Sequence, residues 1–185
     1  MEFLQLEKRR FLEKNIDYLV FMSSLTQGIT YPVYKREISD DEKKSFKEHL
    51  SQRLREFAVN YKHELKEDNK ERHTNNIEIL QNELNSSWHR ILFCHEDKQD
   101  GWITFGRVQK LFNLYLKYHW AMDWVAEPPH CPIDSIVLRN VGLLDSWQSP
   151  HFTKQKYIQA IEKCREKALG KMTIAEWELR MFNSK

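Results

Sequence analysis

Two short polar motifs, each beginning a run of regularly spaced apolar residues, restrict this chain to a helical fold. The segments Ser39–Glu42 and Thr173–Glu176 have the form of a capping box, in which a hydroxyl and a carboxylate satisfy free N–H groups at a helix start. After the first box, apolar residues recur three or four positions apart, at Phe46, Leu50, Leu54, Phe57, Tyr61 and Leu65. This spacing predicts a long amphipathic helix with one buried face.

The same spacing predicts helices along the rest of the chain. Gly28 to Pro32 ends an opening helix, and Glu127-Pro128-Pro129 ends a central helix that runs from about Phe105 to Trp124. Pro132 is expected in the first turn of the next helix. One further helix carries Ile77, Leu80, Leu84 and Trp88. Another begins after Thr153 and ends just before Gly170, and its apolar residues are Tyr157, Ile161, Cys164 and Ala168.

Composition agrees with a helical globular protein. Only 5 Gly and 5 Pro among 185 residues leave little material for a turn-rich β architecture, and 41% hydrophobic residues exceed what a disordered chain carries. The length suits one core. We therefore expect an all-α fold, a single compact multi-helix domain over residues 1–185, with N-terminal helices in 1–94, a central segment at 102–140 and C-terminal helices in 151–185.

Charge and cysteine usage bound the environment of the protein. The formal net charge of +2 is too balanced to identify a nucleic-acid binder by charge alone. Cys94, Cys131 and Cys164 form no CxxC pair, which indicates reduced thiols in a cytoplasm. The acidic N-terminus does not have the form of a signal peptide, and no segment is long and apolar enough to span a bilayer. We expect a cytoplasmic, monomeric protein that does not bind a membrane.

Metal and nucleotide chemistry are disfavoured by spacing. No two histidines or cysteines stand at a helical i, i+4 or CxxC spacing, and one isolated pair, His119 and Asp123, is common by chance. The chain also has no phosphate-binding glycine loop. We expect no metal and no cofactor.

The central helix carries two stripes of different chemistry. One is apolar, and the other mixes hydrogen-bonding groups with indoles at Lys110, Asn113, Lys117, Trp120 and Trp124. The second stripe is suited to line a cleft in which a flat ring stacks on tryptophan while amide or ammonium groups contact its edge. A solvated face whose tryptophans pack against a neighbouring helix explains the same spacing.

Asp134 has a similar double interpretation. The proline before it puts Asp134 at the start of a helix, where free N–H groups and the helix dipole favour an ionised carboxylate. Such an anion can do chemistry, but an aspartate at a helix start is also ordinary capping chemistry.

A resemblance connects these residues. Gly106-x-x-x-Lys110 opening one helix and Pro132-Ile133-Asp134 opening the next resemble the helix-hairpin-helix base-excision DNA glycosylase superfamily. Those enzymes have a glycine-x-glycine-x-lysine hairpin and then a proline-valine-aspartate. Val108 stands where the family has its second hairpin glycine. The resemblance covers residues 102–140 and implies a helix-hairpin-helix-like central segment.

The resemblance implies an activity and a role for each residue. A base would be flipped out of double-stranded DNA and its N-glycosidic bond cleaved, with water or Lys110 as the nucleophile and Asp134 assisting. The other implied roles are base reading and stacking by Asn113, Lys117, Trp120 and Trp124, and backbone binding by Gly106 and Arg107. The base could be a damaged one or a modified phage base attacked in antiviral defence.

A non-catalytic helical module that binds nucleic acid or protein is the alternative. Its partner surface would be the long helix that begins at Ser39. The two functions differ in whether Lys110 and Asp134 face one cleft beside Trp120 and Trp124.

Overall fold

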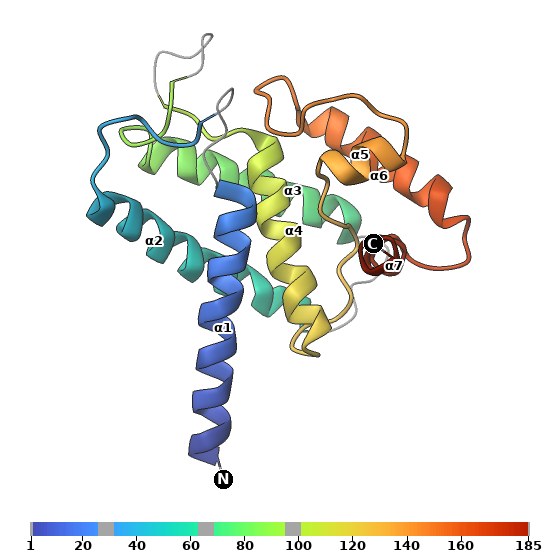
Figure 1. The fold of residues 1–185 in the computed structure, drawn as a ribbon, viewed down its shortest axis with the longest axis horizontal. Coiled ribbons are helices and arrows are strands. Elements are labelled where there is room, and N and C mark those ends of the chain that lie inside the picture. The colour runs from blue at the N-terminus through green and yellow to red at the C-terminus, as the bar shows by residue number, and fades with distance from the viewer. Residues whose placement is uncertain (1, 26–31, 63–68, 95–100, 185) are drawn as a thin grey trace.

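The chain folds into α-helices, as the sequence predicts. The computed structural model describes residues 2–25, 32–62, 69–94 and 101–184. These ranges contain no named strand, and one isolated bridge joins Tyr34 and Leu92. The elements are α1 (Glu2–Leu25), α2 (Asp40–Ala58), a 3₁₀ turn η1 (Val59–Tyr61), α3 (Asn69–Ser87), α4 (Phe105–Ala121), α5 (Ser135–Asn140), α6 (Lys154–Ala168) and α7 (Ile174–Asn183) (Figure 1).

Helix α4 runs through the middle of the fold. It packs against α1 and α3 and also contacts α2 and α6, whereas the N-terminal end of α1 projects from the rest of the molecule (Figure 1). A helix in this position must be apolar on several sides. The buried residues of α4 accordingly surround its axis, and they include Phe105, Val108, Leu111, Phe112, Tyr115 and Leu116.

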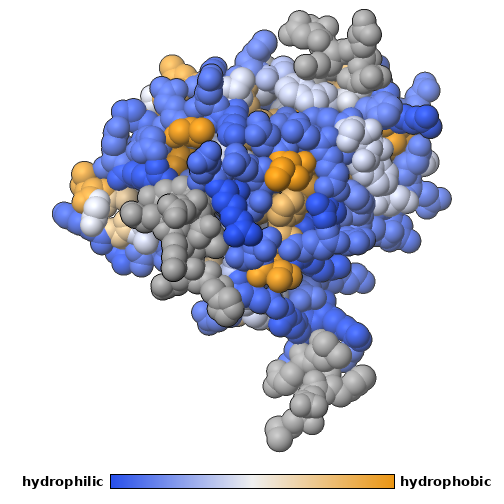
Figure 2. Space-filling model, turned by 180° about the vertical axis from the view of Figure 1, so that it is seen from behind, coloured by the Kyte–Doolittle hydropathy of each residue, from blue (hydrophilic) through white to orange (hydrophobic). Residues whose placement is uncertain are grey.

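One hydrophobic core joins the elements. Buried side chains from all seven α-helices of the described residues form a single cluster. Seen from behind, the surface is mainly hydrophilic, and hydrophobic side chains appear there in separate patches (Figure 2). Among the described residues, no helix combines the length and the apolar character that crossing a membrane requires.

The helix starts predicted at Ser39, Thr153 and Thr173 are confirmed by their caps. The Ser39 hydroxyl accepts from the Glu42 N–H at 3.2 Å, and the Glu42 carboxylate accepts from the Ser39 N–H at 3.0 Å. Thr173 and Glu176 form the same box at α7, with distances of 3.1 and 2.9 Å. Thr153 caps α6 through its hydroxyl.

Three helix boundaries differ from the prediction. Helix α2 ends at Ala58, and Leu65 lies outside the described residues. Helix α4 ends at Ala121, before Trp124, because the chain reverses at Asp123 with φ of 57°.

The third boundary concerns Pro132, which was expected inside a helix and lies outside it. Helix α5 begins only at Ser135, with Asp134 as its N-cap. The backbone of Ile133 is held instead by the Gln109 side chain. The Gln109 amide donates to the Ile133 carbonyl at 2.6 Å, and the Ile133 N–H donates to Gln109 Oε1 at 3.1 Å. The first of these bonds engages the Ile133 carbonyl, which a helix beginning at Pro132 would use as an intrahelical acceptor.

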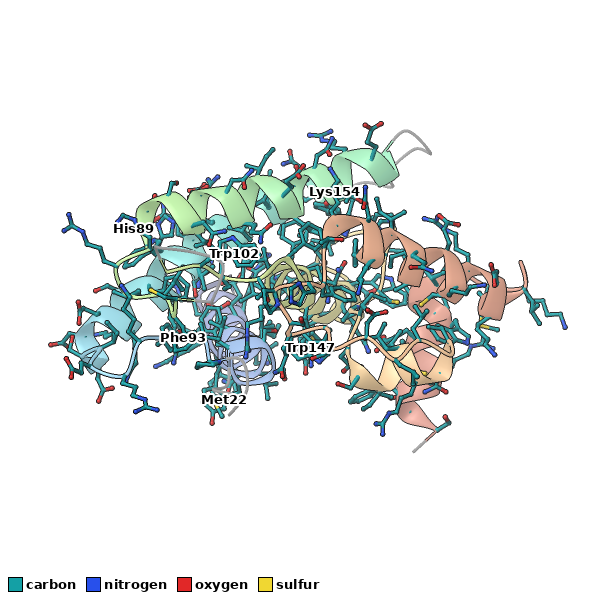
Figure 3. All side chains as sticks on the ribbon, turned by 90° about the horizontal axis from the view of Figure 1, so that it is seen from above. Met22, His89, Phe93, Trp102, Trp147 and Lys154 are labelled. Atoms are coloured by element: carbon teal, nitrogen blue, oxygen red, sulfur yellow. The ribbon has the colours of Figure 1, made fainter. Side chains whose placement is uncertain are left out.

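Gly106 allows the segment around Trp147 to cross α4. A Cβ built on Gly106 would lie 1.6 Å from the Trp147 carbonyl oxygen. The two backbones therefore approach so closely that no side chain fits between them. Figure 3, a view from above, shows Trp147 beside α4, and Lys154 at the start of α6 close to α3.

We predict that Gly106→Ala destabilises the protein by about 1–3 kcal/mol or more, because the added methyl group forces the two backbones apart. Urea unfolding followed by circular dichroism measures this loss. Gly170→Ala is the control, since Gly170 has φ of 63° but nothing within 4 Å of its Cβ position. A loss at Gly106 no larger than the loss at Gly170 would contradict the close approach.

Candidate functional site

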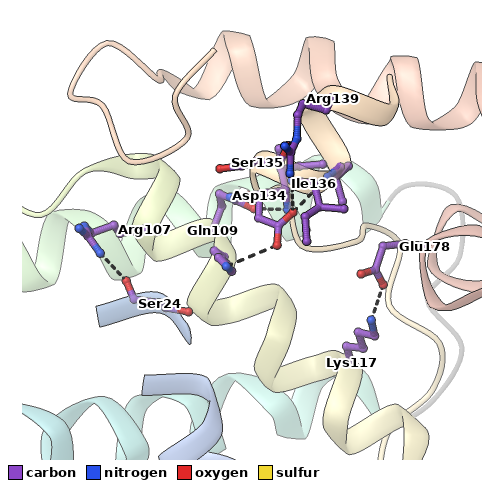
Figure 4. Close-up of polar contacts among 12 residues, drawn as sticks. Ser24, Arg107, Gln109, Lys117, Asp134, Ser135, Ile136, Arg139 and Glu178 are labelled. Carbon is purple, nitrogen blue, oxygen red and sulfur yellow. Dashed lines mark hydrogen bonds and ion pairs between the residues drawn. The ribbon is translucent and has the colours of Figure 1, made fainter. Parts of the chain in front are cut away.

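Lys110 and Asp134, far apart in the sequence, form an ion pair at the junction of α4 and α5. Lys110 Nζ lies 3.5 Å from Asp134 Oδ2. The other carboxylate oxygen, Oδ1, accepts from the N–H groups of Ile136 at 2.9 Å and Val137 at 3.1 Å (Figure 4). One oxygen is thus fixed to the helix start and the other faces the lysine. The two side chains are 12% and 25% exposed, so solvent reaches both only in part.

The environment of Lys110 favours its neutral form more than bulk water does. Burial lowers the pKa of Lys110, and the charge of Asp134 acts in the opposite direction. The Trp147 ring, whose centroid lies 4.5 Å from Nζ, gives a cation–π contact. Sequence reasoning did not identify Trp147, because the segment around it has no helical spacing that would mark it.

A second ion pair follows Lys110 two turns along α4. Lys117 Nζ lies 2.5 Å from Glu178 Oε2 on α7, and it also lies 4.7 Å from the Phe182 ring (Figure 4). Burial raises the pKa of Glu178, while Lys117 lowers it. Lys117 is therefore already engaged by a buried carboxylate, which does not fit the expected base-reading role.

Glu178 was missed by sequence reasoning, although a signal for it exists. It is only 5% exposed and continues the apolar spacing of α7 after Ile174. A carboxylate at such a position requires a buried partner. Lys117 is that partner.

Asn113 lies in the core, where it belongs to a polar network. It is 0% exposed, and its amide donates to the Gln109 carbonyl at 2.8 Å and to the Tyr157 hydroxyl at 3.0 Å. Its Oδ1 lies 2.9 Å from His73 Nε2. This position does not fit the expected role of reading a base, because its hydrogen-bonding groups are used inside the protein.

The same network contains two histidines, His73 and His130. Burial lowers the pKa of His73 to about 4, so the ring is neutral at pH 7. Its Nε2 donates to Asn113, and its Nδ1, 2.8 Å away, accepts from the Tyr61 hydroxyl. His130 extends the network, with its Nδ1 2.8 Å from the Tyr157 hydroxyl and its Nε2 3.4 Å from Arg165 Nη2. The network therefore holds the loop before Asp134 against α6.

The two expected stacking residues lie at the other end of α4. Lys110 and Ala121 are separated by about 16 Å along the helix axis, and Trp124 follows Ala121. There the Trp124 ring contacts Arg9, 4.9 Å from its centroid, and His119. Trp120 is half-buried against the core. Neither indole lies beside Lys110, so neither fits the role of stacking a base held there.

Gly106 and Arg107, expected to bind the DNA backbone, are both buried. Trp147 covers Gly106. Arg107 is 2% exposed, and its Nη1 donates to the Ser24 carbonyl at 2.8 Å near the end of α1 (Figure 4). Burial lowers the pKa of Arg107 to about 10, which leaves it cationic at pH 7. These positions do not fit phosphate binding, because both residues are covered by the protein itself.

Within the described ranges, no group of three or more His, Cys, Asp or Glu residues is arranged to hold a metal ion. Comparison of the chain with protein-family models, with curated proteins and with solved structures gives no match. Any functional assignment therefore depends on the geometry of the Lys110–Asp134 pair.

We predict that Asp134→Ala destabilises the protein by about 1 kcal/mol through loss of the cap, and that Asp134→Asn keeps most of the stability because an asparagine oxygen still caps the helix. Denaturant unfolding of both variants at pH 7 measures the difference. Asp145→Ala is the control, since it removes a surface ion pair with Lys156 and no cap. Equal losses in the alanine and asparagine variants would show that the cap contributes nothing.

Proposed function

We propose that this protein is a DNA glycosylase that cleaves the N-glycosidic bond of a flipped base, with Lys110 and Asp134 as its reacting groups. The observation that carries the proposal is their ion pair, with Nζ and Oδ2 3.5 Å apart. These are the two residues to which the resemblance assigns the chemistry. Their partial burial at a helix start supports the same assignment.

Asp134 acts on the charge that develops as the base leaves. Positive charge then accumulates on the deoxyribose, and a nearby carboxylate stabilises it. Two backbone N–H groups hold Asp134 Oδ1, so the carboxylate is oriented before the substrate arrives. No reorganisation is needed during the reaction.

Lys110 is the proposed nucleophile. Its neutral amine attacks C1′, the bond from Nζ to C1′ forms, and the electron pair of the glycosidic bond leaves with the base. An amine proton passes to the departing base. The C1′–O4′ bond then breaks as the Nζ lone pair forms the C1′=Nζ Schiff base, and O4′ keeps the bonding electrons and takes a proton from water. Such a Schiff base would allow an associated lyase step. The lowered pKa of Lys110 supports this role, because only the neutral amine attacks.

The proposed substrate is double-stranded DNA that carries a damaged base or a modified phage base. The second class would make the protein part of an antiviral defence. The proposal requires no cofactor. We include a cytoplasmic, monomeric protein in the proposal.

A non-catalytic binding module is the second candidate. It is favoured by the positions of Trp120 and Trp124, which do not line the space beside Lys110. In such a module, Asp134 caps α5 and Lys110 packs on Trp147 without further chemistry. The activity measurements separate the two candidates.

We predict that Asp134→Asn lowers base release at least about 100-fold while duplex binding persists, because the variant keeps the cap and loses the charge. Purified protein is incubated with duplexes that contain damaged bases and with modified phage genomic DNA. Alkali then reveals abasic sites, and mass spectrometry identifies the released base. Asp145→Asn is the matched control and should retain full activity. If the wild type binds but releases no base from any DNA, the binding module is the correct function.

We also predict that borohydride traps Lys110 on DNA that contains a preformed abasic site, and that Lys110→Gln abolishes the cross-link. This substrate isolates the lysine from base release. Trapping should increase with pH as the amine loses its proton, with a midpoint below the ordinary lysine value. In Asp134→Asn the midpoint should be lower still, because the carboxylate that favours the ammonium is removed. A cross-link that persists in Lys110→Gln would assign the Schiff base to another lysine.

A further inference from the structure

A groove of about 470 Å³ lies between α1 and α2, away from the Lys110–Asp134 pair. Its floor on α1 includes Tyr18, Phe21 and Met22. Tyr18 is 62% exposed and Met22 49%, which is high for side chains of this size. The lining includes neither Lys110 nor Asp134, so binding in this groove does not depend on the proposed glycosylase chemistry.

Beyond the groove, α1 carries a further exposed apolar side chain on the same side. Phe11 is 68% exposed and precedes Tyr18 by two helical turns, so Phe11, Tyr18 and Met22 share one face of α1. This stripe is about 16 Å long. The length corresponds to three turns of a partner helix laid along it.

Lysines line both sides of the floor. Lys14 lies on α1, and Lys43, Lys44 and Lys47 lie on α2. In the part of the chain that the structure describes, no carboxylate pairs with Lys14 or Lys47. Lys43 and Lys44 pair only within α2, and Lys44 does so at 4.0 Å. Exposed pairs of this kind are weak and are readily exchanged for others.

We propose that the α1–α2 groove binds an amphipathic helix of a partner protein. The apolar face of that helix covers Phe11, Tyr18 and Met22, and its acidic residues pair with Lys14 and Lys47. Burial of the stripe provides the affinity, and the lysines select an acidic partner over a basic one.

Two other occupants fit less well. A phosphate backbone would pair with the lysines of the groove but has no apolar face to cover Phe11, Tyr18 and Met22. A second copy of this chain would set two patches that each carry four lysines against one another, because a symmetric dimer uses the same patch of both subunits.

The test uses two synthetic helical peptides of about 18 residues with the same leucine stripe, one flanked by glutamates and one by lysines. Fluorescence anisotropy should show saturable binding of the glutamate peptide and at least about tenfold weaker binding of the lysine peptide. Lys14→Glu/Lys47→Glu should reverse this preference. Tyr18→Ser/Met22→Ser should lower the affinity for the glutamate peptide at least about tenfold. Lys163→Glu/Lys167→Glu, on α6, is the matched charge control and should leave binding unchanged.

Four results would overturn the proposal. The first two are equal binding of the peptides and an absence of saturable binding by either. The third is displacement of the peptide by duplex DNA together with loss of DNA binding in Lys14→Glu/Lys47→Glu, which would assign the groove to nucleic acid. The fourth is a wild-type dimer in sedimentation that Tyr18→Ser/Met22→Ser dissociates, which would assign it to a second copy. Circular dichroism and urea unfolding verify that each variant is folded. Because all these residues are at the surface, the variants should unfold at wild-type denaturant concentrations.

Discussion

The pairing of the Gln109 side chain with the backbone of Ile133 determines the geometry of the candidate site. Gln109 directly precedes Lys110 on α4, and Ile133 directly precedes Asp134 at α5. The two hydrogen bonds between them, of 2.6 and 3.1 Å, therefore set the register in which the lysine meets the aspartate. Gln109 is fully buried, so an unmade bond would leave a buried polar group without a partner. The free-energy cost of leaving Gln109 without these bonds disfavours any other register of α4 against the Ile133 segment.

Asn113, one turn further along α4, extends the same constraint to α3 and α6. It joins His73 on α3 to Tyr157 on α6, and Tyr157 in turn holds His130 in the loop before α5. A connected buried network favours one arrangement over near alternatives even where its net contribution to stability is small. The neutral state of His73 keeps this network free of a buried charge. Asn113, which the sequence suggested for substrate, therefore helps to align the loop that carries Asp134.

The sequence predicted what local chemistry determines. The capping boxes at Ser39 and Thr173 were correct because a hydroxyl and a carboxylate three residues apart satisfy the helix start without help from the rest of the fold. Lys110 and Asp134 lie 3.5 Å apart, and the role that the resemblance gives them stays a prediction. Periodicity, however, identifies a face of a helix and not what covers it. The segment that brings Trp147 over Gly106, and the end of α1 that Arg107 contacts, come from distant parts of the chain with no spacing that connects them. Helix α5 likewise starts later than expected because a side chain on another helix holds Ile133.

One carboxylate has two cations to stabilise in the proposed reaction. In the free protein Asp134 Oδ2 faces the Lys110 ammonium, which resists loss of its proton. As the glycosidic bond stretches, the sugar itself becomes positive and takes the place of the ammonium as the partner of Oδ2. The positive sugar then offsets the charge of Asp134, so burial becomes the dominant influence on the pKa of Lys110 and its ammonium proton passes to water. A lysine that is cationic and paired at rest can in this way become a neutral nucleophile when the substrate sugar needs one.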